Sequence, residues 1–536
     1  MADASAFKKL TQREHVLARP GMYIGSVEAE LISAWVVSEE AIAEMTGSIA
    51  AEAMSEAQEL QELPEVQELP EVPEAQELPE AQELQELQEL PEDGPKRRKV
   101  AAVAGGGKRK KTTTNTEPVI VLRHNIRYVP GLFKIYDEII VNAIDHATRL
   151  KRARSSDPEI CAVKRIAITI DRTTGIIEVT NDGDGIPVEL HPEHGCHVPE
   201  LIFGHLLTSA NYNDEEEAAS AEGGRTIGGQ NGIGAKACNI YCKWFEVETV
   251  DRVRKKSYKQ RFEDNMSRTL PPVIKAARCR PYVTVRFLPD YARFGMVQGL
   301  TDDMYALMAR RVYDATAVTD PEVAVHLDGN RIDAKSFERY VDLYLGSRGE
   351  AGRAYERIND GWEVAVATSD GTGLQQVSFV NGVATLRGGK HVDHIVQQIC
   401  KRLGDTIQSR RKDVTVRPQY IRDGMFVFVR ATVPNPTFDS QSKETLTTPV
   451  SKFGGGGKIE LSDKFIDKIY KLDGLVDRVA GLSDAAGERG LKKTDGAKRS
   501  TVYGIKKLDD AEWAGTAKSS QCTLILTEGD RCAGWS

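Results

Sequence analysis

The chain has 536 residues, of which 40% are hydrophobic and 28% are charged, and this composition is typical of a globular protein with about three domains. No stretch stays apolar over the roughly 20 residues that a membrane span needs, and no signal peptide opens the sequence, so we expect no contact with a membrane. The eight cysteines include no Cys-x-x-Cys pair, which argues against a zinc or disulfide framework and for a reducing compartment.

The net charge of −8 conceals two segments of opposite sign. Residues 51–93 hold 15 acidic and no basic residues, whereas residues 94–111 hold 8 basic and no acidic residues, so the rest of the chain is close to neutral. Irregularly spaced prolines and few large apolar side chains predict that residues 45–117 form a disordered insertion. Its basic clusters Pro95–Val100 and Lys108–Lys111 indicate either solvated patches or a nuclear-import signal.

Order is expected on both sides of this insertion. Before it, residues 19–25 predict a turn and residues 31–37 a strand. After it, residues 132–150 carry apolar side chains at helical spacing, with Pro130 near the start, which predicts a long helix.

Two polar residues interrupt the apolar pattern of this helix. Glu138 and Asn142 are four positions apart and therefore share one face. A partly exposed helix face would explain them, but apolar neighbours such as Ile135 and Ile139 favour a functional role. In that interpretation Glu138 is the general base that activates an attacking water, and Asn142 is an oxygen ligand of Mg²⁺.

A hairpin is predicted next, with strands at residues 166–170 and 176–180. The sequence Asn-Asp-Gly-Asp-Gly-Ile-Pro follows it at residues 181–187, and a simple turn would explain these residue types. Alternatively, the carboxamide of Asn181 hydrogen-bonds a nucleotide and Ile186 packs on the adenine ring.

A helix over residues 199–208 and a polar loop lead to Gly-Gly-Gln-Asn-Gly-Ile-Gly-Ala-Lys at residues 228–236. The four glycines leave bare N–H groups that can surround an anion, and the helix start predicted at residues 235–240 adds partial positive charge. A P-loop is excluded because Ala235 separates the last glycine from the lysine, and a dinucleotide fingerprint because no strand precedes the glycines. We interpret the stretch as a lid over a nucleoside triphosphate, the alternative being a plain flexible loop.

Two further loops offer phosphate ligands. Ser209 and Asn211 follow the helix at residues 199–208 and could contact ribose and phosphates. Far downstream, Lys443 offers a point charge for the γ-phosphate. Ordinary polar loops are the alternative explanation for both segments.

Beyond a strand at residues 244–250, the alternation of strand-like and helix-like segments from about residue 275 predicts a second α/β domain. Its expected strands are residues 282–288, 323–327, 376–380 and 425–433, and its expected helices are residues 304–312, 337–345 and 391–403. Residues 461–479 are expected to be helical and to leave this domain as a connector.

Together these motifs resemble those of type IIA DNA topoisomerases of the eukaryotic kind, including those of large DNA viruses. The resemblance is carried by residues 14–25, 128–138, 203–209, 228–236, 437–443, 504–510 and 522–530. It implies an α/β (α+β) fold in which a GHKL (Bergerat) ATPase sandwich is followed by a transducer domain of ribosomal-protein-like α/β fold. The implied domains are the ATPase at residues 1–44 and 118–270, the insertion at 45–117, the transducer at 271–450, a helical connector at 451–520 and the start of a TOPRIM domain at 521–536.

The resemblance also implies a function. ATP binding would close the entry gate of a homodimer around double-stranded DNA, with Mg²⁺ as cofactor, and hydrolysis would help reset the gate. The enzyme would act in the nucleus or, if viral, in the host nucleus or viral factory. Glu138 and Lys443 would be catalytic, and residues 408–412 resemble a basic loop that touches DNA, a solvated loop being the alternative. By the same resemblance, nucleotide is bound by Asn142, Asn181, Ile186, Ser209, Ala210, Asn211, Gly229, Gln230, Asn231, Gly232, Ile233, Gly234, Ala235, Lys236, Gln441, Ser442 and Lys443, and metal by Asn142 and Glu528.

The sequence departs from the family pattern at several positions. Ala210 replaces a serine and loses one possible phosphate contact, and Gln230 and Ile233 stand where related lids often carry Arg and Tyr. Ser442 replaces a threonine but keeps the hydroxyl, and the turn at residues 19–25 is closer to the bacterial gyrase version. After Glu-Gly-Asp at residues 528–530 the full metal domain and the cleavage tyrosine do not follow, so we expect a fragment of a longer enzyme that does not cut DNA by itself.

Two other functions fit parts of the sequence. Other GHKL ATPases, such as heat-shock chaperones and mismatch-repair proteins, share the helix and the lid but not the context of residues 438–443 or of residues 527–530. A DNA-binding fragment that keeps the fold without turnover is the third hypothesis.

Overall fold

A computed structural model describes residues 9–44, 117–206, 208, 226–229, 232–346, 352–370, 373–412, 416–454, 458–482, 511, 513 and 518–523 of the chain. Its helices are α1 (Gln12–Ala18), α3 (Pro130–Ser156), α4 (Val198–Gly204), α6 (Gly234–Ile240), α7 (Asp302–Val318), α8 (Phe337–Leu345), α9 (Lys390–Arg410), α10 (Pro418–Asp423) and α11 (Asp463–Tyr470). Short 3₁₀ turns are η2 (Pro20–Met22), η3 (Tyr291–Phe294), η5 (Val450–Lys452) and η6 (Ser519–Gln521). Within these ranges, no helix combines the length and the apolar character that crossing a membrane requires.

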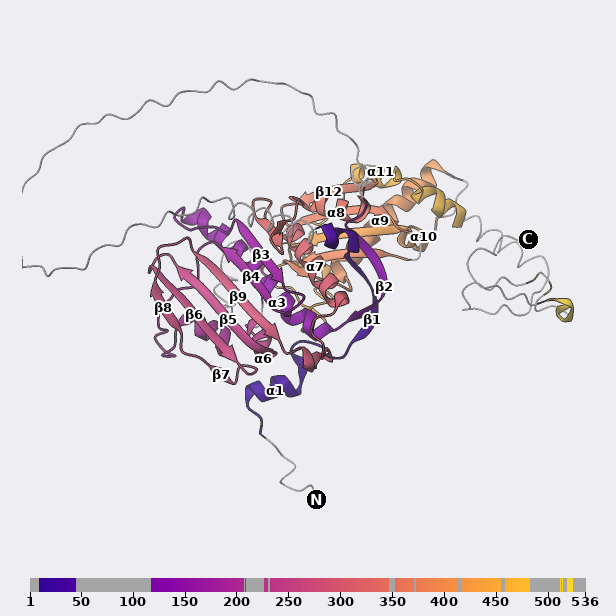
Figure 1. Ribbon diagram of the computed structural model, residues 1–536. Helices are drawn as coiled ribbons and strands as arrows, with labels where there is room; N and C mark the ends of the chain where they lie inside the picture. The colour runs from indigo at the N-terminus through magenta and orange to yellow at the C-terminus, as the bar shows by residue number, and fades with distance from the viewer. Residues whose placement is uncertain are drawn as a thin grey trace, which may run out of the picture.

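The larger sheet has nine strands, which run in the order β11-β10-β3-β4-β9-β5-β6-β7, with β8 also paired to β6 (Figure 1). Its strands are β3 (Arg165–Ile170), β4 (Ile177–Asp182), β5 (Cys242–Asp251), β6 (Lys256–Glu263), β7 (Arg268–Thr269), β8 (Val273–Ala276), β9 (Tyr282–Pro289), β10 (Ala324–Leu327) and β11 (Asn330–Arg331). The predicted hairpin is confirmed, because β3 and β4 pair antiparallel. Only β10 and β3 among these pairs run parallel, as a crossover through α7 allows.

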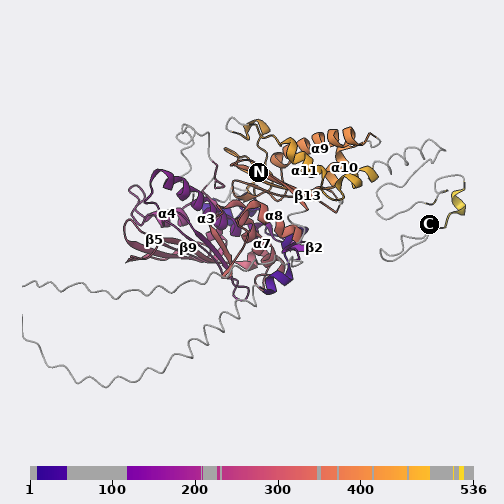
Figure 2. The same cartoon turned by 90° about the horizontal axis from the view of Figure 1, so that it is seen from above.

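Helices cover one face of the larger sheet. Figure 2, which views the molecule from above, shows α3 and α4 lying over the sheet that contains β5 and β9. Strand β4 alternates buried and half-buried residues, so every second side chain, such as Ile177 and Val179, points into the layer beneath the helices. This two-layer arrangement is the predicted sandwich, and α3 runs through its core with 15 buried residues, which is why it can hold polar groups away from water.

A two-stranded ribbon precedes α3 in the chain. Its strands β1 (Glu30–Val37) and β2 (Ile120–Tyr128) pair antiparallel, and Val37 lies opposite Ile120. Ser38 N–H donates to the carbonyl of Val119 at 2.8 Å, which extends the pairing beyond the strands. The long segment between β1 and β2 therefore leaves and rejoins the fold at the same end of one hairpin.

The second sheet has five strands in the order β12-β13-β16-β14-β15. They are β12 (Arg353–Asn359), β13 (Trp362–Thr368), β14 (Gln375–Val380), β15 (Val383–Ala384) and β16 (Met425–Ala431). One face packs under α9 and α11 through residues such as Val364 and Val366, and the other packs toward the first part of the molecule through Ala365 and Ala367. Strands β13 and β16 are therefore buried almost without alternation, as expected for a sheet covered on both faces.

Aromatic side chains join the two parts. Trp35 on β1 stacks on Phe426 of β16 with ring centroids 4.8 Å apart and planes at 11°, and Tyr344 of α8 packs edge-on against both rings. The two sheets thus share one apolar core across their boundary.

The expected domain boundary at residue 271 falls inside the larger sheet. Strand β9 lies between β4 and β5, and β10 pairs with β3, so the first structural unit continues to Arg331. The spacing of apolar residues along a strand indicates which of its faces are buried but not which sheet the strand joins. The expected boundary therefore differs from the observed one.

Two predicted helices also differ from the structure. The helix expected over residues 199–208 ends at Gly204, after which His205 is extended. The helix expected over residues 461–479 is broken: α11 ends at Tyr470, and helical residues resume at 475–482 after Gly474, whose φ of +74° interrupts the turn. Both pieces pack on the second sheet through Phe465 and Val479 instead of leaving it.

Candidate active site

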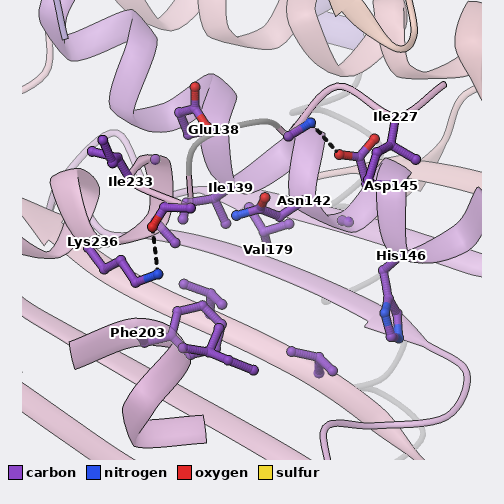
Figure 3. A pocket seen from close by; sticks show the side chains of 18 of the residues that line it. Glu138, Ile139, Asn142, Asp145, His146, Val179, Phe203, Ile227, Ile233 and Lys236 are labelled. Atoms are coloured by element: carbon purple, nitrogen blue, oxygen red, sulfur yellow. Dashed lines mark hydrogen bonds between the residues drawn. The ribbon is translucent and has the colours of Figure 1, made fainter. Parts of the chain in front are cut away.

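Helix α3 presents Glu138 and Asn142 to one cavity. The helix begins at Pro130, whose fixed φ suits a first turn. The four-residue spacing then places both polar side chains in the lining of one cavity, to which the sheet and described residues of the lid, such as Gly229 and Gly232, also contribute (Figure 3). The cavity has a volume of about 230 Å³. Its described lining comprises Glu138, Ile139, Asn142, Ala143, Asp145, His146, Arg149, Val179, Asn181, Ile186, Ile202, Phe203, Thr208, Ile227, Gly229, Gly232, Ile233, Gly234, Ala235, Lys236, Val283, Val285, Gln441 and Lys443.

Lys443 reaches the same cavity from the second part of the molecule. Its Nζ lies 3.6 Å from Oε1 of Glu138 and donates to the carbonyl of Gly228 at 3.1 Å. The lysine is 4% exposed, and its φ of +60° is uncommon for a residue with a side chain. The structure therefore brings together the helix carboxylate and a cation 305 positions later, as the sequence analysis expects.

The beginning of the lid is tied to α3. The N–H groups of Gly228 and Gly229 donate to the two carboxylate oxygens of Asp145 at 3.0 and 2.8 Å. Gly228 also touches the second sheet, because a Cβ at this position would lie 2.9 Å from Val383 and 3.0 Å from the carbonyl of Asn381. The lid thus contacts both parts of the molecule at one point.

The lid ends where α6 begins. A Cβ on Gly234 would lie 1.8 Å from Oε2 of Glu138, so only glycine lets the helix start approach the carboxylate this closely. Gly232 takes a φ of +58°, and the ammonium of Lys236 donates to the carbonyls of Gly232 and Thr208. Backbone and cation together make this end of the cavity suited to an anion.

The other end of the cavity is apolar with one amide. Asn181 stands at the end of β4, is 5% exposed and donates to the carbonyl of Asp182 at 2.9 Å. Ile186 is fixed by its N–H bond to Thr249 Oγ1 at 3.0 Å, and Val179 and Phe203 complete the wall (Figure 3). This end fits a flat, partly apolar group such as a nucleobase.

Of the remaining predicted residues, one lines the cavity, one does not, and six lie outside the part of the chain that the structure describes. Gln441 lines the cavity, whereas Ser442 bonds its hydroxyl to Ser440 at 2.7 Å and does not occur among the described lining residues. Ser209, Ala210, Asn211, Gln230, Asn231 and Glu528 lie outside the described residues.

Two family models match the chain. One, described as "Histidine kinase-, DNA gyrase B-, and HSP90-like ATPase", matches residues 128–263, and the other, described as DNA gyrase B, matches residues 336–494. Among solved structures, the ATPase region of Saccharomyces cerevisiae topoisomerase II is similar with 35% identity and a TM-score of 0.66, covering 90% of this chain and 100% of that one. The chain belongs to the type IIA DNA topoisomerase family.

Other members of the family agree with this assignment. DNA topoisomerase 2 of Arabidopsis thaliana is 43% identical over 417 residues, which cover 76% of this chain and 27% of the relative. The ATPase and transducer domains of DNA topoisomerase II from Balamuthia mandrillaris superpose with a TM-score of 0.67 at 32% identity, covering 91% of this chain and 100% of that one. The chain spans about a quarter of the length of the curated relatives it matches. The predicted GHKL ATPase fold followed by a transducer domain is confirmed.

The topoisomerase site has a distinctive electrostatic arrangement. Burial alone would raise the pKa of Glu138, but Lys134 and Lys443 outweigh it and lower the pKa from 4.5 to about 2. Burial lowers the pKa of Lys443 in spite of Glu138, and burial lowers the pKa of Lys236 to about 8. Burial raises the pKa of Asp145, against the effect of the two lid N–H groups. Glu138 is therefore ionised at neutral pH and held between two cations.

A divalent cation would fit this topoisomerase site only together with a nucleotide. No group of three or more His, Cys, Asp or Glu side chains with metal-binding geometry occurs in the described ranges. Asn142 offers one amide oxygen to the cavity beside Glu138 (Figure 3). Magnesium commonly takes one or two protein oxygens and completes its shell with water and phosphate oxygens, so this donor set suffices.

Sequence reasoning missed several residues in or next to this cavity, among them Asp145, Lys134 and His146 on α3. Asp145 lies three positions after Asn142, and Lys134 lies four positions before Glu138, so both share their helix face. His146 lines the cavity and bonds through Nε2 to the carbonyl of Asp184 at 2.8 Å, which fixes the turn after β4. The helical spacing on α3 could have found all three, because His146 lies four positions after Asn142 on the same helix.

Proposed function

We propose that this chain is the ATP-binding and ATP-hydrolysing entry gate of a type IIA DNA topoisomerase. The observation that carries the proposal is the meeting of Glu138 and Lys443, 3.6 Å apart, on the wall of one cavity that also contains Asn142. A carboxylate, an amide and a cation from two domains are the groups needed to handle a terminal phosphoryl group.

The residues of the cavity divide the work. Asn181 and Ile186 bind the nucleobase of ATP, and the N–H groups of the lid together with Lys236 bind its phosphates. Glu138 orients a water and accepts its proton, while Lys443 neutralises charge on the terminal phosphate. Bound Mg²⁺ would neutralise phosphate charge next to Asn142, in the manner of other phosphoryl-transfer sites.

The action on DNA is part of the same proposal. In the whole enzyme, ATP would join two copies of this chain into a closed gate around one DNA duplex, and hydrolysis would help to reopen it. Its support is the family membership and Lys443, because a cation on the loop that follows β16 can couple the state of the nucleotide to the second sheet.

The decisive experiment is a Mg²⁺-dependent ATPase assay on the protein and on Glu138→Gln. We expect slow hydrolysis that falls on the order of 10²-fold or more in the variant, because the general base is lost while the shape is kept. The matched control is Glu460→Gln, whose carboxylate is 68% exposed on the loop before α11, and its turnover should not change. Unchanged hydrolysis in Glu138→Gln would remove this residue from the role.

Gate closure is tested separately by light scattering. A non-hydrolysable ATP analogue should convert monomers to dimers, in the protein and in Glu138→Gln alike, because binding does not need the base. A chain that stays monomeric with saturating analogue would contradict the gate, while leaving ATP hydrolysis possible.

Nuclear import is a further part of the proposal. Its support is the pair of basic clusters at residues 95–100 and 108–111, which lie outside the described residues. Replacing the lysines and arginines of both clusters by alanine should keep a fluorescent fusion out of the nucleus of a eukaryotic cell. Unaltered nuclear accumulation would show that import does not depend on these clusters.

A further inference from the structure

The carboxylate of Glu138 touches two ammonium groups, which differ in what else they can reach. Lys134 Nζ lies 2.7 Å from Oε1 of Glu138, one helical turn earlier on α3, and Lys443 Nζ lies 3.6 Å from the same oxygen. All three side chains are at most 9% exposed, so each charge depends on the others for compensation.

Lys443 can also interact with an anion bound in the cavity. It lines the cavity and already donates to the carbonyl of Gly228, so an anion that enters the cavity can attract it. Lys134 does not occur among the described lining residues, and it is 4% exposed behind Glu138. Lys134 also attracts Glu444, which is paired with Arg387 at 2.9 Å. Lys134 therefore cannot follow a phosphate and stays with the carboxylate.

The attraction that Glu138 feels comes from Lys134 and Lys443, and two other cations nearby are engaged elsewhere. Arg311 of α7 is committed to Asp137 at 2.5 Å, and Lys236 of α6 is turned to backbone carbonyls. Asp145, on the far side, accepts the lid N–H groups. If Lys443 moved to a terminal phosphate and Lys134 were absent, Glu138 would be a buried carboxylate without a counter-ion, which is costly.

We propose that Lys134 is a positioning residue that keeps Glu138 ionised and aimed at the cavity once Lys443 has turned to the terminal phosphate. This inference rests on the proposed function. In the hydrolytic step a water oxygen bonds to the γ-phosphorus, the bond from that phosphorus to the bridging oxygen breaks, and the bonding electrons leave with ADP. The proton of the water passes to Glu138, while Lys134 transfers no proton and remains an ammonium group throughout.

The test is a double-mutant cycle of Lys134→Met and Glu138→Gln, read as kcat and KM for ATP. Lys134→Met should lower kcat by about 10- to 100-fold, the range of a general base that is misplaced or protonated, and change KM by less than about 3-fold. In the Glu138→Gln background the same substitution should change kcat by less than about 2-fold, because Lys134 acts only through Glu138. Lys134→Arg should keep most of the activity.

Controls separate this role from a structural one. Lys151→Met removes an exposed lysine from the same helix, and its kcat should not change. Calorimetric binding of the ATP analogue should be preserved in Lys134→Met. If that variant fails to fold, Lys134→Gln, which still hydrogen-bonds to Glu138, replaces it in the cycle with the same expected direction.

Three results would overturn the proposal. They are an unchanged kcat in Lys134→Met, an equal loss in the wild-type and Glu138→Gln backgrounds, and a loss confined to KM. Full turnover in the single variant Glu138→Gln would overturn the role of Glu138 as well. That result distinguishes a failure of the proposed function from a failure of the role of Lys134 alone.

Discussion

Glu138, the proposed general base, also contributes to the stability of the site. Two buried ammonium groups lower its pKa from 4.5 to about 2, against the opposite effect of burial. A carboxylate with so low a pKa is a weak proton acceptor. We expect that movement of Lys443 toward a bound phosphate raises the pKa of Glu138 and with it the basicity of the carboxylate.

The same ion pairs predict a dependence of stability on pH. Because the folded pKa is depressed, the contribution of Glu138 is complete above about pH 5 and is lost as pH falls through 4.5 toward 2. At about 1.4 kcal/mol per pKa unit, it amounts to about 3 kcal/mol. The difference in free energy of unfolding between the protein and Glu138→Gln, from urea titrations, should shrink over this range. A difference that is constant from pH 7 to pH 3 would contradict the ion pairs.

Sequence reasoning reached some site residues and not others, for a physical reason. The spacing of Glu138 and Asn142 fixes them on one helix face whatever the fold, so their convergence on a cavity could be predicted. Lys134 shares that face. Whether its ammonium group ends in solvent or beside a carboxylate is decided by packing from α6 and from the loop that carries Lys443. The backbone of Lys443, with its positive φ, is likewise set by its loop and not by local propensity.

At the scale of elements, the start of α6 is fitted to the carboxylate on α3. Gly234 leaves no room for a Cβ, which would lie 1.8 Å from Oε2 of Glu138. Helix α6 can therefore begin this close to α3 because the residue at its start is a glycine.

Gly234→Ala should disrupt this approach. The methyl group must displace either α6 or a carboxylate held by two lysines, and overpacking of this kind costs about 1–3 kcal/mol. We expect a lower melting temperature in calorimetry and an ATPase kcat reduced by about 10-fold or more, as for a misplaced general base. Gly481→Ala is the matched control, because its Cβ meets open space in a helical segment, and it should leave both quantities unchanged or slightly raise the melting temperature. Equal behaviour of the two variants would refute the fit.

Elements were easier to predict than their partners. The long apolar period of α3 and the β-branched hairpin of β3 and β4 specify their structures locally, and both were expected. That β9 pairs with β4 as well as with β5, and that β10 pairs with β3, depends on long-range contacts, because the β4–β9 and β3–β10 partners are 100 or more positions apart. Local patterns in a single sequence do not indicate which distant strands pair, and for this reason the expected boundary at residue 271 differs from the end of the larger sheet.

In the molecule as a whole, one arginine joins helix α3 to the second sheet next to the site. Arg311 is fully buried on α7, pairs with Asp137 of α3 at 2.5 Å and donates to the carbonyl of Gly382 at 2.9 Å. Asp137 precedes Glu138, and Gly382 lies in the turn between β14 and β15. A movement of the second sheet therefore changes the surroundings of α3, the helix that carries the proposed general base Glu138.

Arg311→Met should destabilise the protein by about 3–5 kcal/mol, because Asp137 is left buried without a counter-ion. Adding Asp137→Leu should recover part of the loss, since two apolar groups need no compensation. Arg357→Met, which breaks the exposed pair with Asp360, is the matched control and should cost less than about 1 kcal/mol. Urea unfolding of the four proteins measures these values, and a loss for Arg311→Met as small as that of the control would contradict the proposed junction.

The hairpin formed by β1 and β2 has a practical consequence. Val37 and Ile120 face each other across it, so the two ends of the intervening segment are neighbours in space whatever the length of chain that joins them. A fluorescent protein whose own termini lie close together can be spliced in between them without pulling the strands apart. Energy transfer between a donor and an acceptor placed there in separate copies would then test the proposed gate by timing when two copies come together.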